Sequence, residues 1–234
     1  MLEAAISRLS GGEACRIHGA GRTDAGVHAL GQVAHFASAA WPIPPENLAA
    51  ALNGALPRDL VVRAAKLAEG GFHARYDATE RVYRYVILNR AAPSALLGRF
   101  ALHVRERLDK EAMRAAARHL EGVHDFAAFG RPDAPGKSTV RAVRRVDVRP
   151  WKDCLLVTVA GNAFLRQMVR SFAGTLLAVG RGALRPDDVI AIRNGRDRAL
   201  CPPVAPAHGL CLVRVEYGGT RRTTENENLF GQAE

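Results

Sequence analysis

The sequence predicts an α+β fold in which antiparallel sheets are flanked by helices. Segments with the two-residue alternation of strands follow one another through hairpin-like connections, and helical segments are interspersed among them. The clearest hairpin pairs residues 140–148 with 154–160 around a turn at 150–153. This order favours antiparallel layers over a doubly wound parallel sheet. A chain of 234 residues with 48% hydrophobic residues is large enough for one large domain or two small ones.

The first third of the chain is predicted to begin with a helix over residues 2–9. Leu2, Ile6 and Leu9 recur there at helical spacing, and two glycines follow at 11 and 12. Short strands are expected on either side of a glycine-rich loop, and a short helix and a further strand follow. Their expected ranges are 16–18 and 32–36 for the short strands, 45 to about 53 for the helix, and 60–67 for the further strand.

The remaining elements begin with a strand over 81–88, whose alternation puts Tyr83, Tyr85 and Ile87 on one face. An amphipathic helix over 109–121 has Asp109 as its predicted N-cap. The later elements are expected at 163–179 (helix), 186–194 (helix) and 210–217 (strand). The polar residues 218–234 lack periodicity and are predicted to be disordered.

One loop carries a candidate functional group. Between residues 19 and 31, several glycines surround a single carboxylate, Asp24, with Arg22 two residues before it and His28 four residues after it. Glycines at this density allow positive φ angles and close approach of the backbone. Taken alone, such a loop is more typical of a tight connection in which Asp24 closes an Asx-turn.

The net charge and the cysteine content indicate which partners, metal sites and cross-links the protein can have. The formal net charge of +10 suggests a polyanionic partner such as RNA or DNA, although an arginine-rich proteome would also account for it. Four cysteines without a C-x-x-C pair argue against a zinc site and against a disulfide framework. No apolar run reaches 18 residues, so we expect a cytoplasmic protein that does not enter a membrane.

Several blocks of the sequence resemble the tRNA pseudouridine synthase A family, in the family's order. The longest is Gly21-Arg-Thr-Asp-Ala-Gly-Val-His-Ala29, followed by Gly31-Gln-Val33. The later blocks are Phe72-His-Ala-Arg75, Arg81-x-Tyr-x-Tyr85, Asp125-Phe-x-x-Phe129, Asn162-Ala-Phe-Leu-x-x-Met-Val-Arg170 and Gly209-Leu-x-Leu-x-x-Val-x-Tyr217.

The resemblance implies the pseudouridine synthase fold, with two similar α/β subdomains whose antiparallel sheets are flanked by helices. We expect an N-terminal subdomain over 1–75 that includes the Asp24 loop, and a C-terminal subdomain over 80–217. The family has a further strand with a Tyr-Asp-Gly-type motif and a Gly-Trp-Gln segment ahead of the helix at which this chain begins, so the first subdomain is expected to lack that strand.

The resemblance also implies an isomerase that acts in tRNA processing as a homodimer. It would convert uridine to pseudouridine in the anticodon arm, at tRNA positions 38–40, without a cofactor or metal. Asp24 matches the catalytic aspartate, which is expected to act as a nucleophile at C6 or C1′ of the nucleotide, and a carboxylate could also act there as a base. Arg22 matches the arginine that helps to extrude the base, Tyr83 matches the residue that stacks on the uracil, and Arg170 matches the partner of the aspartate.

Two other functions are compatible with a basic chain. A non-catalytic RNA-binding module would use Tyr83 and Tyr85 as stacking platforms and would not need Asp24. A metal-dependent nuclease is disfavoured because it needs clustered acidic residues, whereas Asp24 has only an arginine and a histidine nearby in the sequence.

Overall fold

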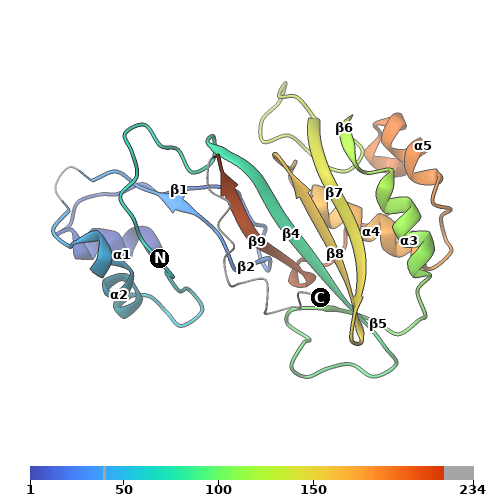
Figure 1. Ribbon diagram of the computed structural model, residues 1–234, viewed down its shortest axis with the longest axis horizontal. Helices are drawn as coiled ribbons and strands as arrows, with labels where there is room; N and C mark the ends of the chain where they lie inside the picture. Colours follow the sequence, from blue (N-terminus) through green and yellow to red (C-terminus); the bar gives the residue numbers. More distant parts are fainter. Residues whose placement is uncertain (39–40, 219–234) are drawn as a thin grey trace. The chain divides into compact units, whose positions relative to one another are not determined.

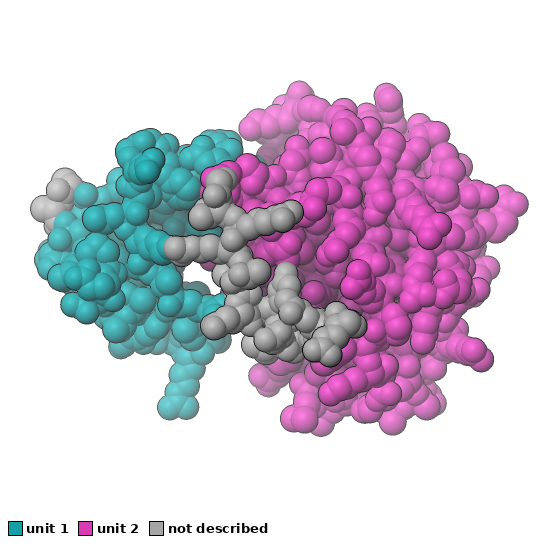
Figure 2. Space-filling view, viewed as in Figure 1, with its two compact units in different colours: residues 1–21, 33–77 teal, residues 22–32, 78–234 magenta. Residues whose placement is uncertain are grey.

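The computed structural model describes residues 1–38 and 41–218. The chain divides into two compact units (Figure 2): unit 1 comprises residues 1–21 and 33–77, and unit 2 comprises 22–32 together with the chain from 78 onward. The Asp24 loop, predicted to be part of an N-terminal subdomain over 1–75, belongs to unit 2. The prediction of disorder over 218–234 falls, apart from Gly218, outside the described residues.

Unit 1 consists of two helices and a two-stranded antiparallel sheet. Its elements are α1 (Leu2–Leu9), β1 (His18–Gly19), β3 (Ala34–His35) and α2 (Pro45–Ala55). The two helices share a small core that includes Ile6 and Leu52. The apolar spacing that predicted the first helix therefore marks its buried face.

The strand predicted over 60–67 does not form. The side chain of Asn53, in α2, forms the hydrogen bonds that a partner strand would otherwise make with Val62. It donates to the Val62 carbonyl at 2.8 Å and accepts from the Val62 N–H at 2.7 Å. Val62 and Ala65 then pack against the core of unit 1. The segment is therefore partly buried against the core of unit 1 without a partner strand.

Unit 2 is built on a seven-stranded sheet (Figure 1). Its strands are β2 (His28–Ala29), β4 (Ala78–Asn89), β5 (Leu102–Val104), β6 (Gly122–Asp125), β7 (Val140–Trp151), β8 (Cys154–Gly161) and β9 (Leu210–Tyr217). The order is β2-β9-β4-β8-β7-β6, and β5 pairs with β4. The central pairs are antiparallel, and the short strands β2 and β5 add parallel pairs to β9 and β4. The predicted α+β class is confirmed.

Three helices cover one face of this sheet: α3 (Lys110–Arg118), α4 (Met168–Gly180) and α5 (Asp188–Gly195). Two 3-10 turns, η1 (Arg198–Leu200) and η2 (Ala207–Gly209), precede β9. Tyr83, Tyr85 and Ile87 all enter the core beneath the helices, which confirms that they share a face of β4. Phe126 and Phe129 are fully buried in the same core.

The ends of the helices show where tertiary contacts override periodicity. Asp109 caps α3 as predicted, because its side chain accepts a hydrogen bond from the Ala112 N–H. The helix predicted from residue 163 begins only at Met168, because Gln167 adopts a left-handed conformation with φ of 67°. Residues 163–167 form an irregular segment in which Arg166 pairs with Arg131. Among the described residues, no helix combines the length and the apolar character that crossing a membrane requires.

Candidate active site

The Asp24 loop is held against the last strand of the sheet. After a turn at residues 25 and 26, in which the Val27 N–H donates to the Asp24 carbonyl at 3.0 Å, the chain runs parallel to β9 with His28 opposite Cys211. Gly26 has φ of +81°, and a Cβ built at this position would lie 3.4 Å from the Cβ of Ala207. The glycine is therefore favoured by the positive φ of the turn, because an added Cβ would make only an ordinary contact with η2.

The carboxylate of Asp24 lies between two arginines of different burial. Arg170, in the first turn of α4, donates from Nη1 to Oδ2 at 2.7 Å, and Arg166 Nε lies 4.0 Å from Oδ1. The side chains of Asp24 and Arg170 are 24% and 15% exposed, whereas that of Arg166 is 73% exposed. Arg170 is thus the protected partner, and Arg166 is open to solvent.

The guanidinium of Arg170 is fixed on two sides. Its Nε donates to the Ala205 carbonyl at 2.8 Å, and the Ala205 N–H returns a hydrogen bond to the Arg170 carbonyl at 3.1 Å. A fork held in this way presents Nη1 to Asp24 with little loss of side-chain freedom. The partnership between Asp24 and Arg170, predicted from the family resemblance, is present in the structure.

The segment that carries Arg166 depends on a glycine. Arg131 and Arg166 exchange backbone hydrogen bonds at 2.9 and 3.3 Å. A Cβ on Gly130 would lie 2.7 Å from the Leu165 Cβ and 2.8 Å from the Arg166 carbonyl oxygen, closer than these atoms can approach. Gly130 therefore lets the chain entering α4 lie where Arg166 reaches Asp24.

Tyr83 is near this ion pair but is mostly enclosed. The residue is 7% exposed, and its ring meets that of Phe164 edge-on with centroids 5.4 Å apart. Burial, with a smaller contribution from the charge of Asp24, raises the pKa of Tyr83 to about 12. The side chain is therefore a neutral phenol at physiological pH.

Three of the four predicted site residues, Asp24, Tyr83 and Arg170, are close enough to interact electrostatically or by hydrogen bonding. The fourth, Arg22, is exposed on the loop two residues before Asp24. His28 contributes to the structure of the loop, since Nε2 lies 2.7 Å from the Arg99 carbonyl oxygen and the ring packs against Phe100. Within residues 1–38 and 41–218, no three His, Cys, Asp or Glu side chains are placed to hold a metal ion.

Sequence reasoning did not place Arg166 and Ala205 in the site. Arg166 lies four residues before Arg170, but this spacing suggested that both were on one helix, which begins only at Met168. Ala205 contributes a backbone carbonyl, for which side-chain chemistry gives no signal.

Comparison with known proteins bears on this site. A family model described as tRNA pseudouridine synthase matches residues 1–77 and 116–218. The tRNA pseudouridine synthase A of Shouchella clausii (strain KSM-K16) is 42% identical over 93% of this chain and 83% of its own length. The proteins of the same name from Syntrophotalea carbinolica and Caulobacter vibrioides are 45% and 46% identical, each over 93% of this chain and over 85% and 87% of their own lengths.

Proposed function

This chain belongs to the tRNA pseudouridine synthase family, and we propose that it isomerises uridine to pseudouridine in the anticodon arm of tRNA, at positions 38–40, with Asp24 as the nucleophile. The proposal depends on one observation. The glycine-rich loop presents the carboxylate of Asp24, and the enclosed Arg170 of α4 holds that carboxylate at 2.7 Å. The Asp24 side chain is still 24% exposed, which leaves it accessible to a nucleotide.

The reaction needs a group that assists cleavage of a glycosidic bond. The N1–C1′ bond breaks, the uracil turns, a C5–C1′ bond forms, and the proton lost from C5 is balanced by a proton gained at N1. An ionised carboxylate can promote the first step by attacking C6 of the ring or C1′ of the sugar. Arg170 donates a charge-assisted hydrogen bond to Asp24, which holds the carboxylate in one orientation in a partly enclosed site.

Arg22 and Tyr83 are proposed to handle the target base. A stacked base must leave its neighbours, which costs a few kcal/mol. Arg22 is exposed on the loop that carries Asp24, so it can occupy the space that the base vacates. Tyr83 offers an aromatic ring close to the carboxylate, and we propose that the uracil stacks on it.

The proposal extends to the partners of the chain. The net charge of +10 suits a tRNA substrate, and we propose a cytoplasmic homodimer that needs neither cofactor nor metal. The alternative of an RNA-binding module built on sheet aromatics is less well supported, because it gives no function to the Asp24–Arg170 pair and because Tyr85, its second platform, is fully buried. Stacking platforms in such modules lie open on the sheet surface.

The test measures pseudouridine in an unmodified tRNA transcript without added metal or nucleotide. It compares the parent chain with Asp24→Asn and with Asp59→Asn, a matched control that removes an exposed carboxylate from unit 1. We expect product from the parent and from Asp59→Asn only, with tRNA binding kept by all three. Product from Asp24→Asn would exclude the nucleophile, and parallel loss of binding and activity would mean that the loop is only structural.

A further inference from the structure

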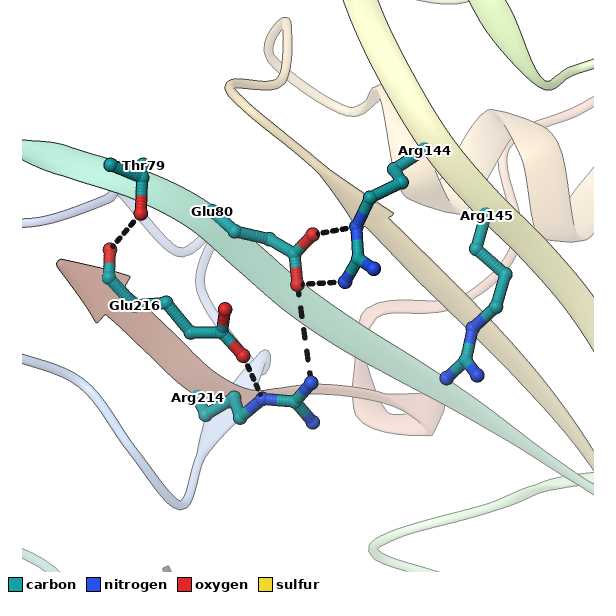
Figure 3. A pocket seen from close by; sticks show the side chains of 6 residues that line it. All are labelled: Thr79, Glu80, Arg144, Arg145, Arg214 and Glu216. Atoms are coloured by element: carbon teal, nitrogen blue, oxygen red, sulfur yellow. Dashed lines mark hydrogen bonds and ion pairs between the residues drawn. The ribbon is translucent and has the colours of Figure 1, made fainter. Parts of the chain in front are cut away.

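A polar pocket of about 400 Å³ lies in unit 2, apart from the predicted site residues (Figure 3). It is lined by Thr79, Glu80, Arg144, Arg145, Arg214 and Glu216, from strands β4, β7 and β9. No aromatic or aliphatic side chain lines it, unlike the pockets that bind small organic ligands. We refer to this site as the arginine pocket.

A β-bulge brings two consecutive arginines into the arginine pocket. Val143 lies opposite Gly161 of β8 and Arg145 lies opposite Ala160, so Arg144 is an extra residue on β7. Neighbouring side chains of a regular strand point to opposite faces, but a bulge can turn two successive side chains to the same side. Both guanidinium groups accordingly line the pocket.

Two of the three arginines are engaged by the two glutamates. Arg144 donates twice to Glu80, including a bond of 2.6 Å from Nη2, and Arg214 donates to Glu216 at 2.8 Å. Arg214 also lies 3.9 Å from Glu80, so the carboxylates hold both guanidinium groups in place. The hydrogen bond to Glu80 raises the pKa of Arg144, which therefore stays charged.

Arg145 is the third arginine of the pocket, and neither glutamate pairs with it. The residue is exposed and, within the described part of the chain, its guanidinium makes no hydrogen bond or ion pair. Three guanidinium groups against two carboxylates give the pocket a net charge of +1. The pocket therefore combines one unengaged guanidinium with two others that are already oriented.

We propose that the arginine pocket holds a phosphate of the tRNA backbone, with Arg145 as its principal ligand. A guanidinium matches a phosphate in charge and in the spacing of its donors, and it can bind two oxygens at once. This inference rests on the proposed function, because it takes tRNA as the substrate.

The place of the pocket on the sheet determines what such a contact can do. Glu80 and Tyr83 are three residues apart on β4, so their side chains lie on opposite faces of the strand. The phosphate therefore belongs to a nucleotide other than the one whose base would meet Tyr83. The contact contributes to tRNA affinity and leaves the chemical step unchanged.

The experiment compares tRNA binding by the parent, Arg145→Ala and Arg118→Ala across a range of salt concentrations. Arg118 is the matched control: it is an exposed arginine on α3, which packs on the other face of the sheet, and within the described residues its guanidinium likewise makes no hydrogen bond or ion pair. We expect Arg145→Ala to weaken binding roughly three- to tenfold at low salt and to lower the slope of log affinity against log salt by roughly 0.7–0.9. Arg118→Ala should change neither quantity appreciably.

Glu216→Gln tests the same pocket with the opposite sign. Its loss of one negative charge raises the charge of the pocket from +1 to +2, and the amide can still accept the hydrogen bond from Arg214. We expect tRNA binding about two- to threefold tighter at low salt, with the gain lost as salt is added. Unchanged binding by Glu216→Gln together with equal effects of Arg145→Ala and Arg118→Ala would overturn the proposal.

Pseudouridine formation by the same proteins separates this inference from the proposed function. Under single-turnover conditions, Arg145→Ala should raise the protein concentration needed for half-saturation and leave the saturating rate at the parent's value. A lower saturating rate would overturn the proposal, because it would place Arg145 in the chemical step. A parent that binds tRNA through Arg145 but forms no pseudouridine would support the pocket and refute the synthase, whereas a parent that does not bind tRNA would refute both.

Discussion

The arginines beside Asp24 differ in what they can contribute. Arg170 is 15% exposed and holds both the carboxylate and the Ala205 carbonyl, so its guanidinium has one preferred position. Arg166 is 73% exposed and 4.0 Å away, so water and salt screen its interaction with Asp24. Arg170 therefore holds Asp24 in position, and Arg166 is available to a ligand.

Replacing each arginine by methionine should separate these contributions. Arg170→Met leaves a partly buried carboxylate without its closest partner, and we expect a loss of about 1–3 kcal/mol in the free energy of unfolding, less than the ~3–5 kcal/mol of a fully buried pair. The rate should fall by about 10²-fold or more, because Asp24 loses its electrostatic support. Urea denaturation and single-turnover assays measure the two effects.

Arg166→Met is the control for that measurement. Its exposed and more distant guanidinium should contribute less than about 0.5 kcal/mol to the free energy of unfolding. Equal destabilisation by the two substitutions would show that neither burial nor the distance to Asp24 sets the strength of the pairs.

At the scale of elements, the two-stranded sheet of unit 1 carries an unusual group of imidazoles. His18 of β1 stacks on His35 of β3 with ring centroids 5.2 Å apart, and His73 lies 4.6 Å from His35. The Ala74 N–H donates to His35 Nδ1 at 3.0 Å, so that nitrogen carries no proton. Burial and the neighbouring His73 and His18 rings together lower the pKa of His35, although a hydrogen bond to the His18 backbone and the charge of Asp77 oppose them.

This arrangement predicts a pH dependence of stability. His35 has a lowered pKa in the folded state, so its neutral form stabilises the fold fully above the ordinary histidine pKa of 6.5, and that stability is lost as the pH falls below 6.5. His35→Asn keeps an acceptor for the Ala74 N–H but cannot titrate. Thermal unfolding between pH 7.5 and 5.5 should therefore show a smaller decrease for the variant, and an identical decrease would remove His35 as the cause.

Helix α4 includes a glycine whose function is close packing. A Cβ on Gly174 would overlap the carbonyl oxygen of Pro203, in the segment that leads to Ala205. Alanine normally favours a helix over glycine by about 0.5–1 kcal/mol. Here the overlap outweighs that preference, because the segment beside α4 is backbone that cannot rotate out of the way.

Opposite effects are thus expected for two glycine-to-alanine substitutions in helices. Gly174→Ala should lower the free energy of unfolding by about 1–3 kcal/mol. Gly54→Ala, in α2 with no atom within 4 Å of the added Cβ, should raise it by a few tenths of a kcal/mol, up to about 1 kcal/mol. Chemical denaturation of both variants measures the signs, and a stabilising Gly174→Ala would contradict the overlap.

At the scale of the whole molecule, the course of the chain brings the candidate site into one unit. The chain leaves unit 1 after residue 21, contributes the Asp24 loop to unit 2, and returns to unit 1 at residue 33. Asp24, Tyr83 and Arg170 therefore meet within unit 2, although 146 residues separate Asp24 from Arg170. The net charge of +10 gives the chain a general attraction for RNA, and the arginine pocket would localise part of it.

The sequence alone determined the α+β class, most of the helices and strands, the N-cap at Asp109 and the candidate residues. The class, the elements and the N-cap follow from local signals, namely apolar periodicity and turn residues, whereas the candidate residues follow from the family resemblance. The motifs also indicated the family, which the comparisons establish. The catalytic and substrate-binding roles of Asp24, Arg22, Tyr83 and Arg170 stay predictions.

Only the tertiary structure decided the features that depend on contacts between distant residues. The start of α4 at Met168 depends on the pairing of Arg166 with Arg131, and the absence of a strand over 60–67 depends on the bonds from Asn53. The carbonyl of Ala205 and the bulge at Arg144 are backbone features without a local signature in side-chain type. The sequence gives the chemical groups that are present, and the fold determines which of them come within hydrogen-bonding distance. The fold decides this because a displacement of a few ångströms turns a paired charge into one that a ligand can bind.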